Sequence, residues 1–348
     1  MDKTQFRRKI LRWFDQHGRR ELPWQKNPTA YRVWISEIML QQTQVATVIP
    51  YFHQFLSRFP TIRSLARSNV DEVLQHWSGL GYYARARNLH KSAIIISEQY
   101  KGRFPSDFNE VVALPGIGRS TAGAILSLAQ QQAFAILDGN VKRVLARYFS
   151  ISGWPGQNAV LQQLWQHAEQ LTPTRRVGDY NQAMMDLGAI VCKRSKPECS
   201  SCPLQKGCRA YQTDSQTSFP GKKPRKELPI KAIQMLILIN EDRHILLERR
   251  PPTGVWGGLL SFPETTLAIK ASHWCKLNLN STVYRQRSLS TRRHSFTHFH
   301  LDITPVYVWI RQNRQRVMEG ERWVWYKDKS IVGGFPAPVS LLLQQLDL

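Results

Sequence analysis

The 348-residue sequence has few acidic residues, few cysteines and no long apolar segment. Only 25 Asp and Glu residues oppose 48 Lys and Arg, which gives a formal net charge of +23. That excess predicts a polyanionic partner, with nucleic acid ahead of a membrane surface, since no run of about 18 apolar residues occurs. The first residues also lack the apolar core of a secretory signal. We therefore expect a cytoplasmic protein with no membrane partner, in which five cysteines stay out of disulfides.

The pattern of apolar residues changes along the chain. Helical spacing predominates in residues 1–212, most clearly in 31–47, 70–77, 84–99, 120–131 and 140–149. Residues 213–228 are rich in Ser, Thr, Pro and Lys, as in a linker. Strand-like segments follow, namely IQMLILIN, HILLERR, ITPVYVWI and RWVWYKD, and then a closing helix, APVSLLLQQL. The sequence predicts a mostly α-helical domain at 1–212, a linker at 213–228 and a smaller α+β domain at 229–348.

Four cysteines are closely spaced near the end of the helical part. Residues 192–208 read CKRSKPECSSCPLQKGC, a C-x6-C-x2-C-x5-C array. Four thiolates within 17 residues can surround one centre, either a structural zinc ion or a [4Fe–4S] cluster. The spacing alone does not choose between the two. Cys275 stands alone in the second domain, where we expect it to be a core residue.

Residues 114–118, LPGIG, predict a tight turn between two helices. Leu114 and Ile117 can anchor the turn in the core, while Gly116 and Gly118 allow the backbone to approach a ligand closely. Amide groups at the start of the following helix would then face a phosphate oxygen. An ordinary connection between two helices is the competing interpretation.

Two acidic residues, Glu37 and Asp138, are candidates for acid–base chemistry. In YRVWISEIMLQQTQV, Glu37 shares an apolar helical face with Val33 and Leu40, a setting that raises the pKa of a carboxyl group. Asp138 precedes a helix that begins near Asn140, where amide donors and the helix dipole favour the ionised carboxylate. A half-exposed glutamate and a simple helix cap would give the same pattern. Nothing in the sequence requires the two side chains to lie close together.

Taken together, the cysteine array, the LPGIG turn and the LDGN segment at 137–140 resemble the helix–hairpin–helix DNA glycosylases that carry an iron–sulfur cluster. Within that superfamily, SEIMLQQTQV, GLGYYARARNL and NQAMMDLGAIVC are similar to the MutY-type adenine DNA glycosylases, which remove adenine mispaired with 8-oxoguanine. The match covers most of residues 1–212. The resemblance selects a [4Fe–4S] cluster over zinc, with Cys192, Cys199, Cys202 and Cys208 as its ligands.

The resemblance also implies roles for individual residues. Glu37 would be the general acid that protonates adenine, Asp138 would stabilise an oxocarbenium-like sugar, and Asn140 would support the sugar and the reaction water. Base removal is a glycoside hydrolysis, for which an acid and a second carboxylate are the expected pair. Gln42 and Tyr82 would fill the gap that the extruded base leaves in the duplex. For Tyr82, packing in the core is the alternative.

Ser120 bears on whether base removal is coupled to strand cleavage. Relatives that also cut the DNA backbone carry a lysine at this position, and its amine attacks the sugar to form a Schiff base. A serine is a poor substitute, so the sequence predicts a glycosylase without an efficient lyase step. Lys142 lies near Asp138 in the sequence, and we expect it to contact a DNA phosphate.

The second domain resembles the Nudix fold. Residues 258–264, GLLSFPE, match the opening of the Nudix signature, but Ser272 and His273 stand where the signature needs Arg-Glu, and no acidic pair comes after them. A divalent ion then lacks its carboxylate ligands, so we expect this domain to bind rather than to hydrolyse. In MutY-type enzymes the corresponding module recognises 8-oxoguanine. Their Phe-Ser-His loop is similar to Phe296, Thr297 and His298, although a histidine-rich surface turn would look alike.

The sequence thus predicts a monofunctional adenine DNA glycosylase. Its expected partner is double-stranded DNA containing A opposite 8-oxoguanine or G, and we expect it to act as a monomer. Three alternatives stay open: a bifunctional, endonuclease III-like glycosylase/lyase acting on oxidised pyrimidines, a non-catalytic DNA-binding or iron–sulfur sensor protein, and a Nudix pyrophosphatase. Ser120 and the second domain disfavour the first of these, and the incomplete Nudix signature disfavours the last.

Overall fold

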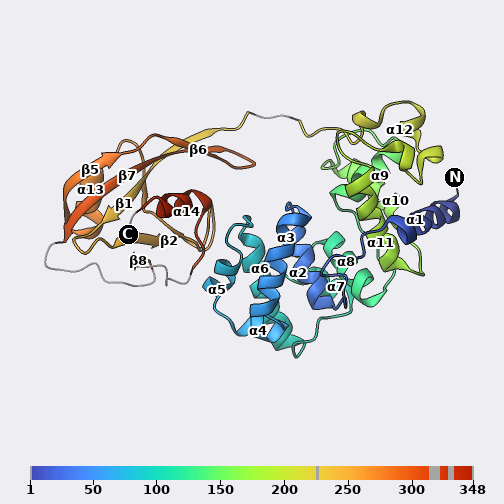
Figure 1. Cartoon of the computed structure of the whole chain (residues 1–348), viewed down its shortest axis with the longest axis horizontal. Coiled ribbons are helices and arrows are strands. Elements are labelled where there is room, and N and C mark those ends of the chain that lie inside the picture. Colours follow the sequence, from blue (N-terminus) through green and yellow to red (C-terminus); the bar gives the residue numbers. More distant parts are fainter. Residues whose placement is uncertain (1, 225–226, 313–321, 328–332, 347–348) are drawn as a thin grey trace. The chain divides into compact units, whose positions relative to one another are not determined.

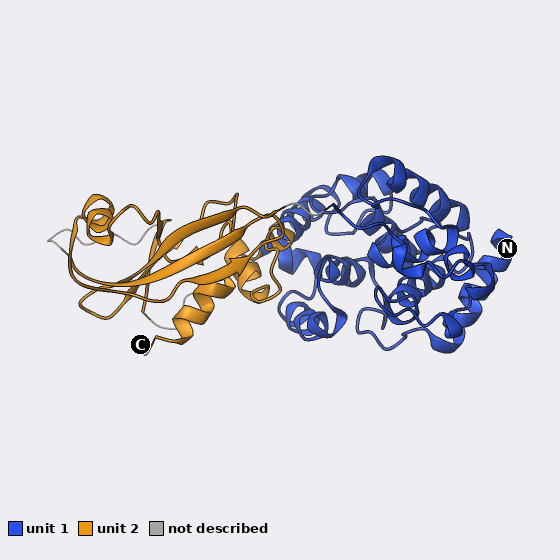
Figure 2. Cartoon of the chain, turned by 90° about the horizontal axis from the view of Figure 1, so that it is seen from above, with its two compact units in different colours: residues 1–67, 88–225 blue, residues 68–87, 226–348 orange. Residues whose placement is uncertain are grey.

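The computed structural model describes residues 2–224, 227–312, 322–327 and 333–346. It forms two compact units: residues 1–67 with 88–225 make up unit 1, and residues 68–87 with 226–348 make up unit 2 (Figure 2). Unit 2 therefore takes in a short segment, 68–87, that lies in the helical part of the sequence. The predicted linker includes residues 225–226, which lie outside the described residues.

Unit 1 is built from helices (Figure 1). They are α1 (Lys3–His17), α2 (Ala30–Leu40), α3 (Val45–Arg58), α4 (Ile62–Arg67), α7 (Phe108–Ala113), α8 (Arg119–Gln130), α9 (Gly139–Phe149), α10 (Asn158–Leu171), α11 (Val177–Asp186), α12 (Arg209–Gln212) and the short helices η1 (Leu187–Val191), η2 (Cys199–Ser201), η3 (Gln205–Gly207) and η4 (Gln216–Ser218). Helix α5 (Val70–His76) belongs to unit 2, and α6 (Ala84–Gln99) begins in unit 2 and continues into unit 1. The predicted helical character of this part of the chain is confirmed.

One predicted helix, at 31–47, is wrong in its extent. Helix α2 ends at Leu40, and α3 begins only at Val45. Between them Gln42 has a φ of 59°, which is a left-handed conformation that an α-helix cannot contain. The apolar periodicity continues across this break and so conceals it in the sequence.

The core of unit 1 connects the helices that carry the candidate carboxylates. Helix α2 packs on α8, and α8 and α9 both pack on α11. Helix α1 closes this core with fully buried side chains such as Phe6 and Ile10. Glu37 on α2 and Asp138 at the start of α9 are thereby brought into one helical assembly.

Besides α5, unit 2 contains a mixed sheet with helix α13 (Ala271–Leu279) on one face and helix α14 (Ala337–Gln344) on the other. Its strands are β1 (Ile230–Ile239), β2 (Ile245–Arg249), β3 (Leu260–Ser261), β4 (Glu264–Thr265), β5 (Ser281–Ser288), β6 (Arg292–Ser295), β7 (His300–Gln312) and β8 (Trp323–Tyr326). The main order is β3-β2-β1-β7-β5, with β4 on β1, β6 on β7 and β8 on β2. Strands β1 and β7 run parallel, with Ile230 opposite His300, and the other pairs are antiparallel.

Alternate residues of β1 separate the two faces of this sheet. Met235 and Ile237 point to one core, which helix α14 (Ala337–Gln344) covers. Leu236 and Leu238 point to the other, which helix α13 (Ala271–Leu279) covers with the fully buried Cys275. The predicted core position of Cys275 is confirmed. The sequence did not predict β3 to β6. Strands β3 and β4 have only two residues each, and the residues of β5 and β6 are largely exposed and therefore form no apolar run.

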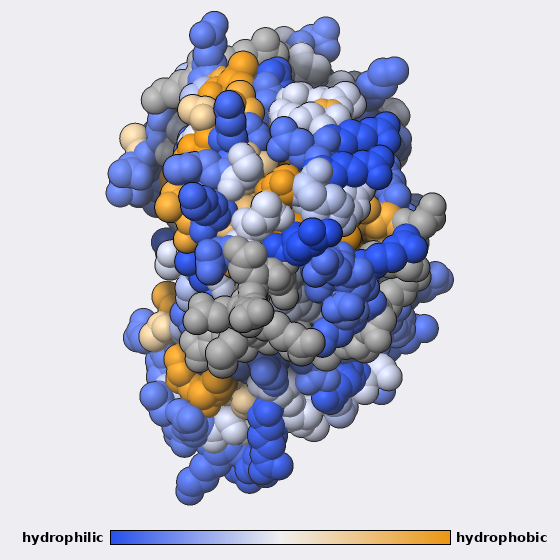
Figure 3. Space-filling model, turned by 90° about the vertical axis from the view of Figure 1, so that its left-hand side faces the viewer, coloured by the Kyte–Doolittle hydropathy of each residue, from blue (hydrophilic) through white to orange (hydrophobic). Residues whose placement is uncertain are grey.

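The face of the molecule shown in Figure 3 is mainly hydrophilic where it is coloured. On the face shown in Figure 3, apolar side chains form small groups separated by hydrophilic ones. Across the described residues, none of the helices is both long and apolar enough to cross a membrane.

Candidate active site

Glu37 lies in the last turns of α2, among buried neighbours. Val33, Trp34 and Ile38 are all nearly inaccessible to solvent, and the Glu37 side chain itself is only partly exposed. No hydrogen-bond donor in the described part of the chain reaches its carboxyl group. Burial, and after it the negative charge of Asp138, raise the pKa of Glu37 to about 8. The carboxyl group is therefore protonated at neutral pH.

Asp138 is the N-cap of α9. Its carboxylate accepts hydrogen bonds from the Val141 amide at 2.8 Å and from Nδ2 of Asn140 at 3.1 Å. Burial raises the pKa of Asp138, while these donors and the nearby Arg143 guanidinium act in the opposite direction. The sequence predicted only the ionising influences, and in this respect the prediction was wrong. Packing around the cap, which local sequence does not reveal, outweighs them.

The two carboxyl groups have unequal surroundings. The negative charge of Asp138 acts on Glu37, so the groups share one electrostatic site. Two close carboxyl groups in a buried site do not both ionise readily. Because Asp138 has two hydrogen-bond donors and Glu37 has none in the described residues, a single proton is held on Glu37. The site thus presents one neutral acid and one carboxylate.

A hydrogen-bond path runs from Asp138 towards the cysteine loop. Asn140 donates to Asp138 and accepts from Nη2 of Arg143 at 2.8 Å. The same guanidinium donates to the backbone carbonyls of Cys192 at 2.7 Å and Gly188 at 2.6 Å. Gly188 lies so close to Asn140 that a Cβ there would fall 2.5 Å from the Asn140 Cβ. The orientation of Asn140 is therefore fixed from both sides.

The LPGIG turn has the predicted form. It joins α7 to α8, with Leu114 and Ile117 buried and Gly116 at a φ of +80°. Gly118 caps α8 without any side-chain hydrogen bond, and a Cβ placed there would meet nothing within 4 Å. The first turn of α8 is therefore open to an external anion.

Ser120 has an internal hydrogen bond. Its hydroxyl accepts from the backbone amide of Leu137 at 2.9 Å, which ties α8 to the residue immediately before Asp138. Lys142 lies in the first turns of α9 and is partly exposed.

Gln42 and Tyr82 are both exposed and both have left-handed backbones. Their φ angles are 59° and 48°, respectively. Tyr82 is 48% exposed, which rules out the alternative of core packing. Non-glycine residues in this conformation are uncommon, and they concentrate at functional sites.

A cavity of about 440 Å³ lies beside α2 and α11. Its lining includes Trp24, Gln25, Val33 and Gln182, and Val33 is one helical turn from Glu37. Both polar atoms of the Gln25 side chain are buried without a partner in the described residues. Such an amide can bind a ligand that offers one donor and one acceptor. No feature of the sequence indicated this cavity.

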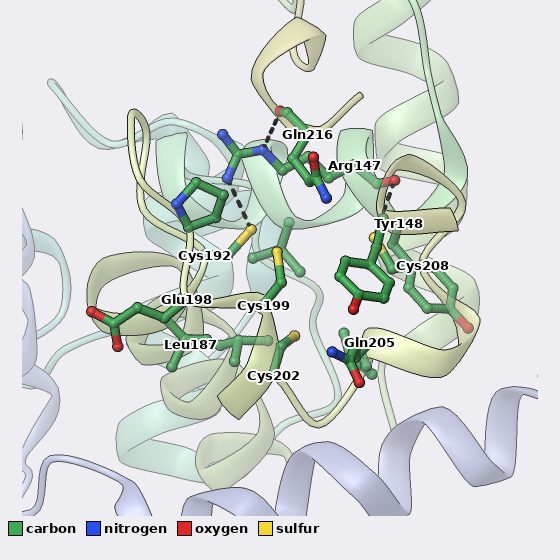
Figure 4. Close-up of a pocket in the computed structure, with 15 residues that line it drawn as sticks. Arg147, Tyr148, Leu187, Cys192, Glu198, Cys199, Cys202, Gln205, Cys208 and Gln216 are labelled. Carbon is green, nitrogen blue, oxygen red and sulfur yellow. Dashed lines mark hydrogen bonds between the residues drawn. The ribbon is translucent and has the colours of Figure 1, made fainter. Parts of the chain in front are cut away.

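The four cysteines of the array line a single cavity. Figure 4 shows Cys192, Cys199, Cys202 and Cys208 arranged around one space, with Arg147 reaching to Cys192. All four are free thiols. Burial raises the pKa of Cys202 to about 12, and the other three thiols add to that increase. Once deprotonated, four such thiols form a donor set that a cationic centre can hold together.

Arg147 is the main structural support of this loop. Its side chain is 2% exposed, and Nη1 lies 3.3 Å from the Cys192 sulfur. The guanidinium also donates to four backbone carbonyls, those of Lys193 and Arg194 within the cysteine array and those of Gln216 and Phe219 after it. Sequence reasoning missed Arg143, Arg147 and Gly188. For Gly188 a signal existed, since a glycine inside a helical pattern usually has a packing reason.

In unit 2 the predicted recognition residues form the turn between β6 and β7. The amide of Phe296 donates to the carbonyl of Phe299 at 2.9 Å, and their rings stack at 4.6 Å. Thr297 and His298 are exposed at the tip of this turn. Trp256 packs against Phe296 from the side, with ring centroids 5.5 Å apart. The aromatic side chains of Phe296, Phe299 and Trp256 thus support a turn that exposes the polar side chains of Thr297 and His298 to solvent.

The Nudix signature positions lie on and before helix α13. Ser272 and His273 are exposed on α13. Glu264 is paired with Arg250 at 2.6 Å. No group of three potential metal ligands is assembled anywhere in the described residues.

Comparisons with known proteins agree with a helical part followed by a Nudix-like part. The model of the HhH-GPD superfamily of base excision DNA repair proteins matches residues 35–170, and the NUDIX domain model matches residues 234–345. The chain is 41% identical to an adenine DNA glycosylase of Buchnera aphidicola (subsp. Schizaphis graminum), covering 97% of this chain and 98% of that protein. The corresponding protein of Rattus norvegicus is 35% identical, over 94% of this chain and 75% of its own.

Solved structures of DNA glycosylases are similar in fold to the helical part of the chain. A thermostable thymine-DNA glycosylase superimposes with a TM-score of 0.56 at 30% identity, over 61% of this chain and 97% of its own. An endonuclease III in complex with DNA shares the fold, with a TM-score of 0.53 at 24% identity over 62% of this chain and 98% of its own. The chain belongs to the adenine DNA glycosylases, within the HhH-GPD superfamily of base excision DNA repair proteins.

Proposed function

We propose that this protein hydrolyses the N-glycosidic bond of adenine paired with 8-oxoguanine or G in duplex DNA, without cutting the backbone. The observation that carries the proposal is the pairing of a protonated Glu37, with a pKa of about 8, and Asp138 in one site. A neutral acid beside a carboxylate is the arrangement that glycoside hydrolysis needs.

The two carboxyl groups divide the chemistry between them. Glu37 donates its proton to a ring nitrogen of adenine, so that the glycosidic electron pair leaves with a neutral base. Asp138 then lies beneath the cationic sugar as its counter-charge, and water supplies the new oxygen at the sugar carbon. Asn140, fixed by Arg143 and Gly188, orients the Asp138 carboxylate and supports the sugar and the water.

The cavity lined by Val33, one helical turn from Glu37, is the proposed pocket for the extruded base. An adenine edge offers an amino donor next to a ring-nitrogen acceptor, which complements the unpartnered amide of Gln25. Trp24 supplies an aromatic wall and Gln182 a second amide. A base can reach this depth only after leaving the duplex.

The rest of the protein contributes to DNA binding. Gln42 and Tyr82 would occupy the gap left by the base, while the open N-terminus of α8 and Lys142 would hold phosphates. Leu114, Gly116, Gly118 and Ser120 form or support that turn. In unit 2, Phe296, Thr297 and His298 would read the 8-oxoguanine. We expect one protein molecule to serve one duplex.

The cysteine loop is the proposed site of a [4Fe–4S] cluster. No three potential ligands in the described residues converge closely enough to hold one metal ion, yet all four cysteines border one space. Four cysteines can hold either a zinc ion or a [4Fe–4S] cluster, and the resemblance to the iron–sulfur DNA glycosylases favours the cluster. When bound, the group would supply the positive charge that the thiolates need.

Ser120 separates this function from the endonuclease III-like alternative. A lyase needs an amine near the sugar. Here the corresponding residue is Ser120, whose hydroxyl accepts a hydrogen bond from the Leu137 amide. The assay incubates the protein with duplexes carrying A opposite 8-oxoguanine, A opposite G, or thymine glycol, and scores base release and strand breaks separately. Adenine release without prompt strand breaks is expected. Thymine glycol release with immediate cleavage and no adenine release would refute the proposal.

A further inference from the structure

Residues 68–87 are bound to the Nudix-like domain rather than being part of unit 1 (Figure 2). Asp71 on α5 forms an ion pair with Arg249 of β2 at 2.6 Å. The Tyr83 hydroxyl donates to the backbone carbonyl of Phe335 at 3.0 Å, and Arg87 donates to that of Gly257 at 2.5 Å. Three contacts from both ends of the segment therefore hold it to the sheet domain.

The packing at this contact is close. A Cβ on Gly334 would lie 3.0 Å from the Leu74 carbonyl oxygen, so the domain approaches α5 backbone to backbone. The Asp71 and Arg249 side chains are only 20% and 30% exposed. A partly buried ion pair contributes more than a fully solvated one. The contact is therefore a built interface with specific geometry.

Tyr82 lies between the anchors Asp71 and Arg87, and its side chain is exposed. It lies next to the anchoring Tyr83 and has a left-handed backbone. Arg85 contacts Tyr82 through a cation–π interaction, with the guanidinium 5.6 Å from the ring centroid. The same guanidinium donates to the carbonyls of Leu80 and Gly81 at 3.2 Å. A strained residue of this kind keeps its conformation only when its surroundings fix it.

We propose that the Nudix-like domain is also a positioning element for Tyr82, which it holds through Arg249, Phe335 and Gly257. The inference rests on the proposed function, in which Tyr82 enters the duplex. Arg249 and Tyr83 are then positioning residues that act through Tyr82 and do not touch the reacting atoms. The domain that recognises the lesion would thereby also fix the position of Tyr82, the residue that keeps the base extruded.

The first test measures whether the domain holds the segment. Amide hydrogen exchange of residues 78–87 is compared in the full-length protein, without DNA, for wild type, Arg249→Met and Tyr83→Phe. Arg311→Met is the matched control, since it removes an exposed ion pair with Glu241 in the same domain. We expect exchange about fivefold faster in the two anchor variants and unchanged in the control. The swap Asp71→Arg with Arg249→Asp should restore slow exchange. Unchanged exchange in Arg249→Met and Tyr83→Phe would overturn the inference.

The second test asks whether the anchors act through Tyr82. Single-turnover release of adenine is measured for Arg249→Met in the wild-type and Tyr82→Leu backgrounds. We expect a loss of about fivefold in the first background and none in the second. Equal losses in both backgrounds would contradict the inference. If the wild-type protein releases no adenine, the proposed function fails and so does the link to base extrusion, while the exchange test still decides whether the domain holds the segment.

Discussion

The Glu37→Gln variant should be more stable than the wild type, by a margin that grows as the pH rises. The same substitution should remove nearly all of the activity. The carboxyl group has an ordinary pKa of 4.5 when the chain is unfolded and a pKa of about 8 in the folded site. Between these values the folded protein keeps a proton that the unfolded chain releases. Raising the pH therefore favours unfolding throughout this window. Glutamine has a similar shape and does not titrate, so the variant avoids this loss.

The size of the effect follows from the shift in pKa. Each pH unit between 4.5 and about 8 lowers the free energy of unfolding of the wild type by about 1.4 kcal/mol relative to the variant. At pH 7 the difference amounts to about 3 kcal/mol, and near pH 5 it is below about 1 kcal/mol. Against this gain, removal of the general acid should lower the rate of adenine release by about 10²–10⁴-fold.

Urea denaturation at pH 5 and at pH 7 measures the stability difference directly. Glu98→Gln is the matched control, because Glu98 is an exposed glutamate on α6. We expect the midpoints of Glu37→Gln and wild type to separate as the pH rises and those of the control to move together with the wild type. A separation that is constant or shrinks with pH would show that Glu37 is not protonated in the folded protein.

Three further predictions concern the surroundings of the site. Gly188→Ala places a methyl group 2.5 Å from the Asn140 Cβ, so single-turnover adenine release should fall at least about tenfold. This loss is expected even though alanine has a higher helix propensity than glycine. A rate equal to that of the wild type would exclude the positioning of Asn140 by Gly188. Arg147→Met removes five hydrogen bonds and should lower the free energy of unfolding by about 3–5 kcal/mol. It should also weaken the visible absorbance expected of the proposed cluster, and intact absorbance with unchanged stability would refute this. Thr297→Ala with His298→Ala should reduce the preference for 8-oxoguanine over G in competition assays while the rate on saturating substrate is kept, and an unchanged preference would show that the exposed turn does not read the lesion.

Local periodicity predicted the elements that have one clear apolar face. Helices α2, α8 and α9 have such a face. Strands β1, β2, β7 and β8 appear in the sequence as apolar segments, and the structure confirms all seven elements. The exposed strands β5 and β6 have none, and the left-handed Gln42 interrupts a helix without disturbing its periodicity. Elements were therefore missed where burial is low, where the element has only two residues, as in β3 and β4, or where one backbone angle decides the local path.

Long-range packing explains the rest of what the sequence did not show. The raised pKa of Glu37 could be predicted from the apolar face of its own helix. The raised pKa of Asp138 could not, because the groups that bury it come from elsewhere in the fold. The same holds for Gly188 beside Asn140, for Arg147 among its five acceptors, and for the attachment of residues 68–87 to unit 2.

The pH dependence of single-turnover adenine release from a duplex with A opposite 8-oxoguanine tests the two-carboxyl account most directly. If Glu37 must be protonated, the rate should be steady near neutral pH and fall about tenfold per pH unit above about 8, with this decline absent from the residual rate of Glu37→Gln. A rate that keeps rising through pH 9, or the same decline in Glu37→Gln, would contradict the account.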